Sequence, residues 1–164
     1  MLALSYVRFE LGSSLNNDEK AYMIRKLAAY LLAVIVAYIL ASITATQSVI
    51  AQLAEMGVDV NFADRLSMTL HDIAGMAGMF LPMIAAAFLA AFLVVALLCR
   101  WLGRRLIALY VLAGAVALIG IHLTLNLAVG ITPIAIARTM GGLLIQGLAG
   151  AVGAYLYPYT NRWT

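Results

Sequence analysis

The residues best able to do chemistry inside the apolar segments of this chain are three amides, one histidine, one arginine and one threonine. His122 and Asn126 are four residues apart, so on a helix they share one face. Ionisable and amide side chains are costly in hydrocarbon unless they have partners, so such residues in a membrane segment indicate a functional site. The candidate ligand-binding residues are His122, Asn126, Arg138, Gln47, Gln146 and Thr139.

These six residues could line a pocket that opens to the outer leaflet. Arg138 would then receive an anionic group such as a phosphate or a carboxylate. The alternative is structural: Arg138 anchors its helix at the headgroups, and His122 and Asn126 form hydrogen bonds with a neighbouring helix. The residues alone leave both interpretations open.

His71 and Asp72 resemble a general acid–base pair, but neighbouring residues on a helix point in directions about 100° apart. Helix rise places His71 about 40 Å, His122 about 24 Å and Gln146 about 16 Å above the inner ends of their segments. Two histidine ligands of one heme iron need nitrogens about 4 Å apart. We therefore expect no heme, no metal and no other cofactor, and the pair only weakly indicates a membrane enzyme.

Composition excludes a soluble globule. Of the 164 residues, 65% are hydrophobic and only 10% are charged, and the mean hydropathy is +1.03. Soluble domains carry about 45–50% apolar and about 25% charged residues. The single cysteine, Cys99, excludes an internal disulfide, and no nucleotide-binding or zinc-protease motif occurs. The basic residues lie at segment ends and predict membrane orientation and not nucleic-acid binding.

Four apolar runs are long enough to cross a bilayer, which needs about 20 residues. We predict an all-α integral membrane protein with four transmembrane helices in an antiparallel bundle, at about 27–52, 68–99, 106–129 and 136–157. Pro82 should kink the second helix and Pro158 should stop the fourth. Asp64 is expected to cap a short turn that leads into the second.

Lysine and arginine predict the orientation. With both termini inside, eight of the ten basic residues lie on the inner side and only Arg65 and Arg138 lie outside. We expect a bacterial inner-membrane protein with both termini in the cytoplasm. Most polar residues of the spans then fall in the outer half.

Residues 1–22 differ from the single four-helix domain predicted for 23–164. Either Met23 is the native start and this extension comes from an upstream initiation codon, or it forms an amphipathic cytoplasmic helix on the membrane surface. A natively expressed peptide covering 8–20 would exclude the first interpretation.

Gly- and Ala-rich faces on the second and fourth helices predict close helix packing, within the chain or with a membrane partner or second copy. The first functional hypothesis is a non-enzymatic accessory or assembly subunit. The second is a binding or transport module for a lipid, a quinone or another amphipathic anion, and a small membrane enzyme comes last. The bilayer is the expected environment in each case.

Overall fold

The computed structural model describes the backbone of residues 2–103, 106–129, 136 and 139–160, and side chains from residue 18 onward. These residues form four helices and no strand. The helices are α1 (Leu2–Glu55), α2 (Phe62–Leu102), α3 (Ile107–Val129) and α4 (Met140–Thr160). Each contains a segment long and apolar enough to cross a membrane, which confirms the coarse prediction of an all-helical chain with four candidate spans.

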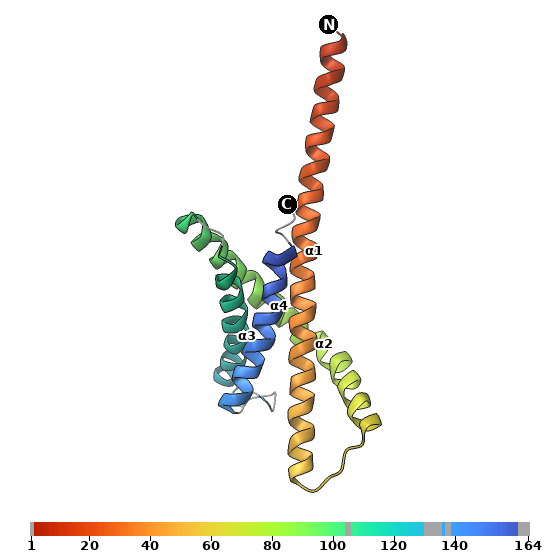
Figure 1. Ribbon diagram of the computed structural model, residues 1–164, viewed down its shortest axis with the longest axis vertical. Helices are drawn as coiled ribbons and strands as arrows, with labels where there is room; N and C mark the ends of the chain where they lie inside the picture. The colour runs from red at the N-terminus through yellow and green to blue at the C-terminus, as the bar shows by residue number, and fades with distance from the viewer. Residues whose placement is uncertain (1, 104–105, 130–135, 137–138, 161–164) are drawn as a thin grey trace.

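The first helix is much longer than its predicted apolar run. It continues without a break through residues 2–26 and, with 54 residues, would measure about 80 Å. Figure 1 shows it as one rod whose N-terminal part stands clear of the other helices. The hydrocarbon core of a bilayer is only about 30 Å thick, so α1 extends well beyond a single crossing.

The predicted start of the second span and the predicted end of the fourth differ from the structure. α2 begins at Phe62, and Asn61, not Asp64, is its N-cap: the Asn61 side chain accepts a hydrogen bond from the Asp64 backbone N–H at 2.9 Å. α2 is one helix on both sides of Pro82, and the kink predicted at this proline stays a prediction. α4 continues past Pro158 to Thr160, because a proline in the last turn removes only one backbone donor.

The helices surround a common core. α1 packs against α2 and α4, and α3 packs against the same two helices. α2 crosses the other three obliquely, so that both of its ends diverge from them (Figure 1). The structure therefore differs from four aligned rods, and the antiparallel bundle remains a prediction.

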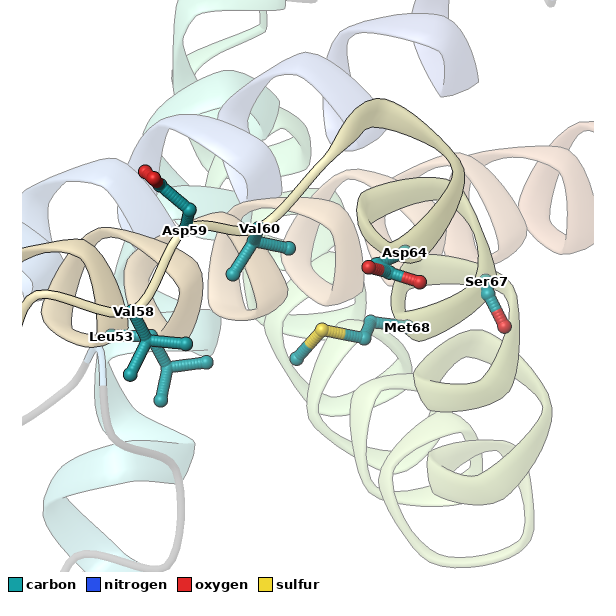
Figure 2. Close-up of a pocket in the computed structure, with 7 residues that line it drawn as sticks. All are labelled: Leu53, Val58, Asp59, Val60, Asp64, Ser67 and Met68. Carbon is teal, nitrogen blue, oxygen red and sulfur yellow. The ribbon is translucent and has the colours of Figure 1, made fainter.

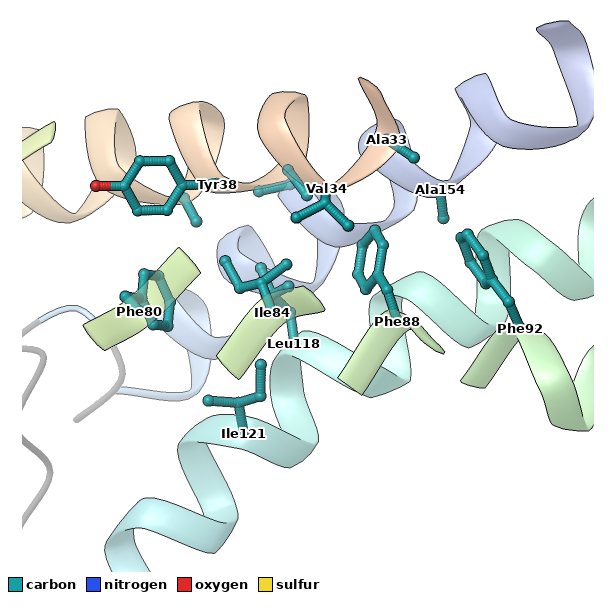
Figure 3. Close-up of a cluster of buried hydrophobic side chains, with 13 residues drawn as sticks. Ala33, Val34, Tyr38, Phe80, Ile84, Phe88, Phe92, Leu118, Ile121 and Ala154 are labelled. Carbon is teal, nitrogen blue, oxygen red and sulfur yellow. The ribbon is translucent and has the colours of Figure 1, made fainter. Parts of the chain in front are cut away.

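The core is built from large side chains on α2 and small ones on α1. Phe80, Ile84, Phe88 and Phe92 recur every fourth residue of α2 and are buried, as Figure 3 shows. On α1 the buried residues form two parallel rows, one of them entirely alanine. The alanine row is Ala29, Ala33, Ala37, Ala41 and Ala45. Such a row lets a second helix approach closely.

α4 packs closely against α1 on one side and against α3 on the other. A side chain at Gly153 would come within 2.5 Å of the Ala37 Cβ and 2.7 Å of the Ala33 carbonyl oxygen on α1. One at Gly150 would collide with the backbone of Gly114 on α3. Gly150 and Gly153 of α4 are therefore covered by other helices of the same chain.

Candidate functional site

Four polar side chains are buried among the transmembrane helices. We call them the polar cluster: Ser42, Thr46, His122 and Gln146, each no more than 1% exposed. They come from α1, α3 and α4. Burying a polar group without a hydrogen bond costs about 1–3 kcal/mol in proteins, so each of these groups needs a partner.

Gln146 connects α4 to α1. Its Nε2 donates hydrogen bonds to the carbonyl oxygen of Ala41 at 3.0 Å and to Oγ1 of Thr44 at 3.2 Å. A carbonyl oxygen can only accept, so the Ala41 bond fixes which end of the amide faces α1. The Oε1 of Gln146 therefore points away from these partners.

His122 of α3 lies at the level of Gln146 on α4. Ile119, one turn before His122, meets Gly147, the residue after Gln146, where an added Cβ would lie 2.9 Å from the Ile119 Cδ1. The His122 ring also lies near Phe80 of α2, with 5.8 Å between ring centroids. Neither ring nitrogen meets the geometry of a hydrogen bond with any described residue, and the same is true of Oε1 of Gln146 and Oγ of Ser42. The polar cluster thus holds four buried polar atoms with unused hydrogen-bonding capacity.

Thr46 joins the polar cluster to the edge of α2. Its Oγ1 donates to Oδ2 of Asp72 at 2.8 Å and lies 3.0 Å from the carbonyl oxygen of Ser42. Asp72 is half-buried. Polar groups therefore extend from this carboxylate toward the centre of the helices.

The other predicted site residues that the structure describes lie at exposed or half-buried positions. His71 is exposed while Asp72 turns toward α1, which separates the two as their helical spacing predicts. Asn126 and Gln47 are exposed, and Nε2 of Gln47 donates to Thr69 at 3.4 Å. Among the described candidates for ligand binding, His122 and Gln146 are buried, whereas Gln47, Asn126 and Thr139 are exposed.

Arg138 lies outside the described residues, so its predicted role is not addressed by the structure. Thr139 has an evident local role. Its Oγ1 accepts a hydrogen bond from the Gly142 backbone N–H at 3.0 Å, which is the bond of a helix N-cap.

Sequence reasoning missed two contributions of α1. Ser42 and Thr46, one helical turn apart, were visible as a polar pair at helical spacing but were not site candidates. Tyr38 and Tyr30 also went unassigned as contacts: their hydroxyls donate to the α2 backbone carbonyls of Ile73 and Ala85, the latter at 2.5 Å. These bonds attach α2 to α1 at two levels.

A shallow hollow of about 350 Å³ lies elsewhere, at the turn between α1 and α2. Figure 2 shows its lining, which is mostly apolar with two carboxylates, Asp59 and Asp64. Asp64 is already bonded to Asn61 at 2.7 Å, and Asp59 points away from the other lining residues. No predicted site residue lines this hollow.

Within the described residues, no three His, Cys, Asp or Glu side chains are grouped so that they could hold a metal ion. Four long apolar helices define the chain as a multi-pass membrane protein. Comparison with known proteins finds no matching family model, no matching curated protein and no matching solved structure.

Proposed function

We propose that this protein is a non-enzymatic accessory or assembly subunit that binds a transmembrane helix of another membrane protein along α2. The observation that carries the proposal is an exposed row of small residues on that helix. We call it the α2 face: Ala74, Gly78, Pro82, Ala86 and Ala90, one every four residues and all exposed. Small residues at this spacing let two helices approach closely in lipid.

The glycine of the α2 face is open. A Cβ added at Gly78 would meet nothing within 4 Å, and the same holds for the adjacent Gly75. At Gly150 and Gly153 of α4, by contrast, a Cβ would collide with α3 or α1. The small residues of α4 therefore serve the fold, whereas those of the α2 face have no partner among the described residues.

Pro82 leaves a backbone carbonyl on the α2 face that needs a hydrogen-bond donor. Proline has no N–H to give to the carbonyl of Gly78, which lies four residues earlier on the same exposed face. Lipid cannot supply a hydrogen bond to a backbone carbonyl. A hydroxyl or amide side chain on an incoming helix would supply that bond.

Photo-crosslinking in native membranes tests the proposal. With a photoreactive residue introduced at Ala86, we expect one crosslinked product to a second membrane protein, and we expect Gly78→Leu to reduce its yield at least about tenfold by blocking close approach. Gly120→Leu is the matched control, because Gly120 on α3 also has nothing within 4 Å.

Two results would contradict the proposal. One is a product whose yield does not respond to Gly78→Leu. The other is a product with twice the mass of the chain, which would identify the partner as a second copy.

A second candidate function is a binding or transport module, and the polar cluster favours it. Buried groups with unused hydrogen bonds are what a site for an amphipathic molecule needs. In this proposal His122 and Gln146 contact the ligand, and Arg138 binds the phosphate, carboxylate or carbonyl oxygens of a lipid, a quinone or another amphipathic molecule from the periplasmic side. Arg138→Ala would then abolish retention of a co-purifying lipid or quinone, and unchanged retention would remove this candidate.

For orientation, we propose an inner-membrane protein with an antiparallel arrangement of helices and both termini in the cytoplasm. The distribution of the basic residues supports this orientation. So do the contacts between α1 and α4: residues 146 and 153 of α4 approach residues 41 and 37 of α1, so the two helices run in opposite directions. In a Cys99→Ser background, Met56→Cys should react with a membrane-impermeant maleimide in intact cells. Thr160→Cys should react only after permeabilisation, and the reverse pattern would invert the orientation.

A further inference from the structure

We propose that Ser42, His122 and Gln146 form an internal site for a water-sized neutral molecule, in which Gln146 positions His122 in one tautomer. The site is distinct from the α2 face and does not depend on helix docking there. It rests on buried side chains from three helices whose polar atoms are unpartnered among the described residues.

The orientation of Gln146 determines the chemistry of its neighbour. Because Nε2 is committed to Ala41 and Thr44 on α1, the group that Gln146 offers to His122 is the acceptor Oε1. An acceptor stabilises a protonated ring nitrogen, since a neutral imidazole carries one N–H donor and one acceptor nitrogen. The nitrogen nearer Oε1 is therefore the protonated one, and the opposite nitrogen is left as an acceptor.

Two groups in the site then still lack a hydrogen-bond partner. The second nitrogen of His122 needs a donor, and the hydroxyl of Ser42 needs a partner that can accept or donate. Two sets of contacts bring Ser42 toward His122. The Phe80 ring centroid lies 5.8 Å from that of His122 and 6.3 Å from that of Tyr38, which is one turn before Ser42 on the same buried row of α1. Gln146 bonds Ala41 and Thr44, which flank Ser42 in the sequence. A water molecule can donate to the nitrogen and exchange a hydrogen bond with the hydroxyl at the same time.

The charge balance favours a neutral occupant. The four residues of the polar cluster carry no formal charge when His122 is neutral. The Asp72 carboxylate lies next to the cluster and accepts a hydrogen bond from Thr46. Ser42, His122 and Gln146 offer no counter-charge to an ion placed between them, and a buried unpaired charge is far more costly than a buried dipole. Water satisfies the unused groups without that cost.

Nitrogen NMR of the full chain in lipid bilayers tests the inference. The chain has two histidines, so His71→Asn leaves His122 as the only imidazole to be labelled with ¹⁵N. We expect a neutral ring with one tautomer favoured about tenfold, as one net hydrogen bond provides. We also expect magnetisation transfer from water to the ring.

Three variants separate the contributions. Gln146→Met keeps the length of the side chain but removes the acceptor, and it should bring the two tautomers to comparable populations. Ser42→Ala should abolish water transfer while leaving the tautomer unchanged. Ser48→Ala is the matched control, since Ser48 accepts a hydrogen bond from Gln52 outside the polar cluster, and it should change neither signal.

A mixture of tautomers in the His71→Asn parent protein would overturn the positioning role of Gln146, even if Gln146→Met failed to fold. A ring without water transfer in the parent protein, or transfer that Ser42→Ala left intact, would overturn the hydration site. Loss of docking at the α2 face would affect neither result.

Discussion

Replacing Gly150 with leucine is expected to separate α3 from α4 and to cost about 3 kcal/mol or more of unfolding free energy. A Cβ at this position would lie 3.0 Å from the carbonyl carbon of Gly114 and 3.1 Å from the Cβ of Leu118. The colliding atoms belong to backbone and to the base of a side chain, so rotamer changes cannot make room. The two helices would have to move apart along their contact.

The effect should be large because lipid offers no compensation. Helix association in a bilayer depends on close packing, since lipid tails solvate apolar side chains as well as a protein interior does. Moving α4 outward would also loosen its contact with α1, where Gly153 meets Ala33 and Ala37. One substitution would therefore weaken two interfaces.

Unfolding by SDS titration in mixed micelles, followed by circular dichroism or gel mobility, measures the change. Gly141→Leu is the matched control, because Gly141 lies on α4 and has nothing within 4 Å. We expect it to change the unfolding free energy by less than about 0.5 kcal/mol. Equal losses in both variants would show that α4 tolerates no leucine anywhere and would contradict the packing argument.

The four spans could be predicted from the sequence because a long uninterrupted apolar run is stable in lipid and not in water. Their ends could not, because helices continue into water wherever local capping allows. α1 persists through residues 12–20, in which Leu15 is the one large apolar residue. α2 begins at Phe62, six residues before the predicted start, directly after its asparagine cap. Hydropathy is insensitive to both features.

The candidate site was only partly predictable, for a geometric reason. Depth counted along separate helices places His122 and Gln146 about 8 Å apart along the membrane normal, yet the structure brings them to one level of the α3–α4 contact, where Ile119 meets Gly147. Counting assumes aligned helices and known starting points. The oblique course of α2 (Figure 1) and the tyrosine bonds that attach it to α1 arise from tertiary packing, which has no simple periodic signature.

The polar cluster also has a counterpart nearer the opposite ends of the helices, made of aromatic rings. Phe92 of α2 has its ring centroid 4.8 Å from that of Tyr157, 5.4 Å from Tyr110 and 6.3 Å from Tyr30. All four helices thus meet at one ring. Aromatic residues gather at membrane interfaces, which accounts for the depth of these tyrosines but not for their contact with Phe92.

Phe92→Ala is accordingly expected to be as damaging as Gly150→Leu, by the opposite mechanism. Phe92 is only 6% exposed, and truncating a buried phenylalanine costs about 3–5 kcal/mol because the surrounding groups collapse incompletely. The aromatic pairs that Phe92 forms add to this loss. The same SDS titration should show α1, α3 and α4 losing their common contact in a single, earlier transition.

Phe62→Ala provides the control on the same helix, because Phe62 is 81% exposed at the start of α2. Its truncation removes no contact with the core, and we expect a change of less than about 0.5 kcal/mol. Phe92→Leu should fall between the two, since it restores volume without the ring. If Phe92→Ala were no worse than Phe62→Ala, the aromatic contacts would not hold the four helices together, and the Tyr30 and Tyr38 hydrogen bonds to α2 would have to do so instead.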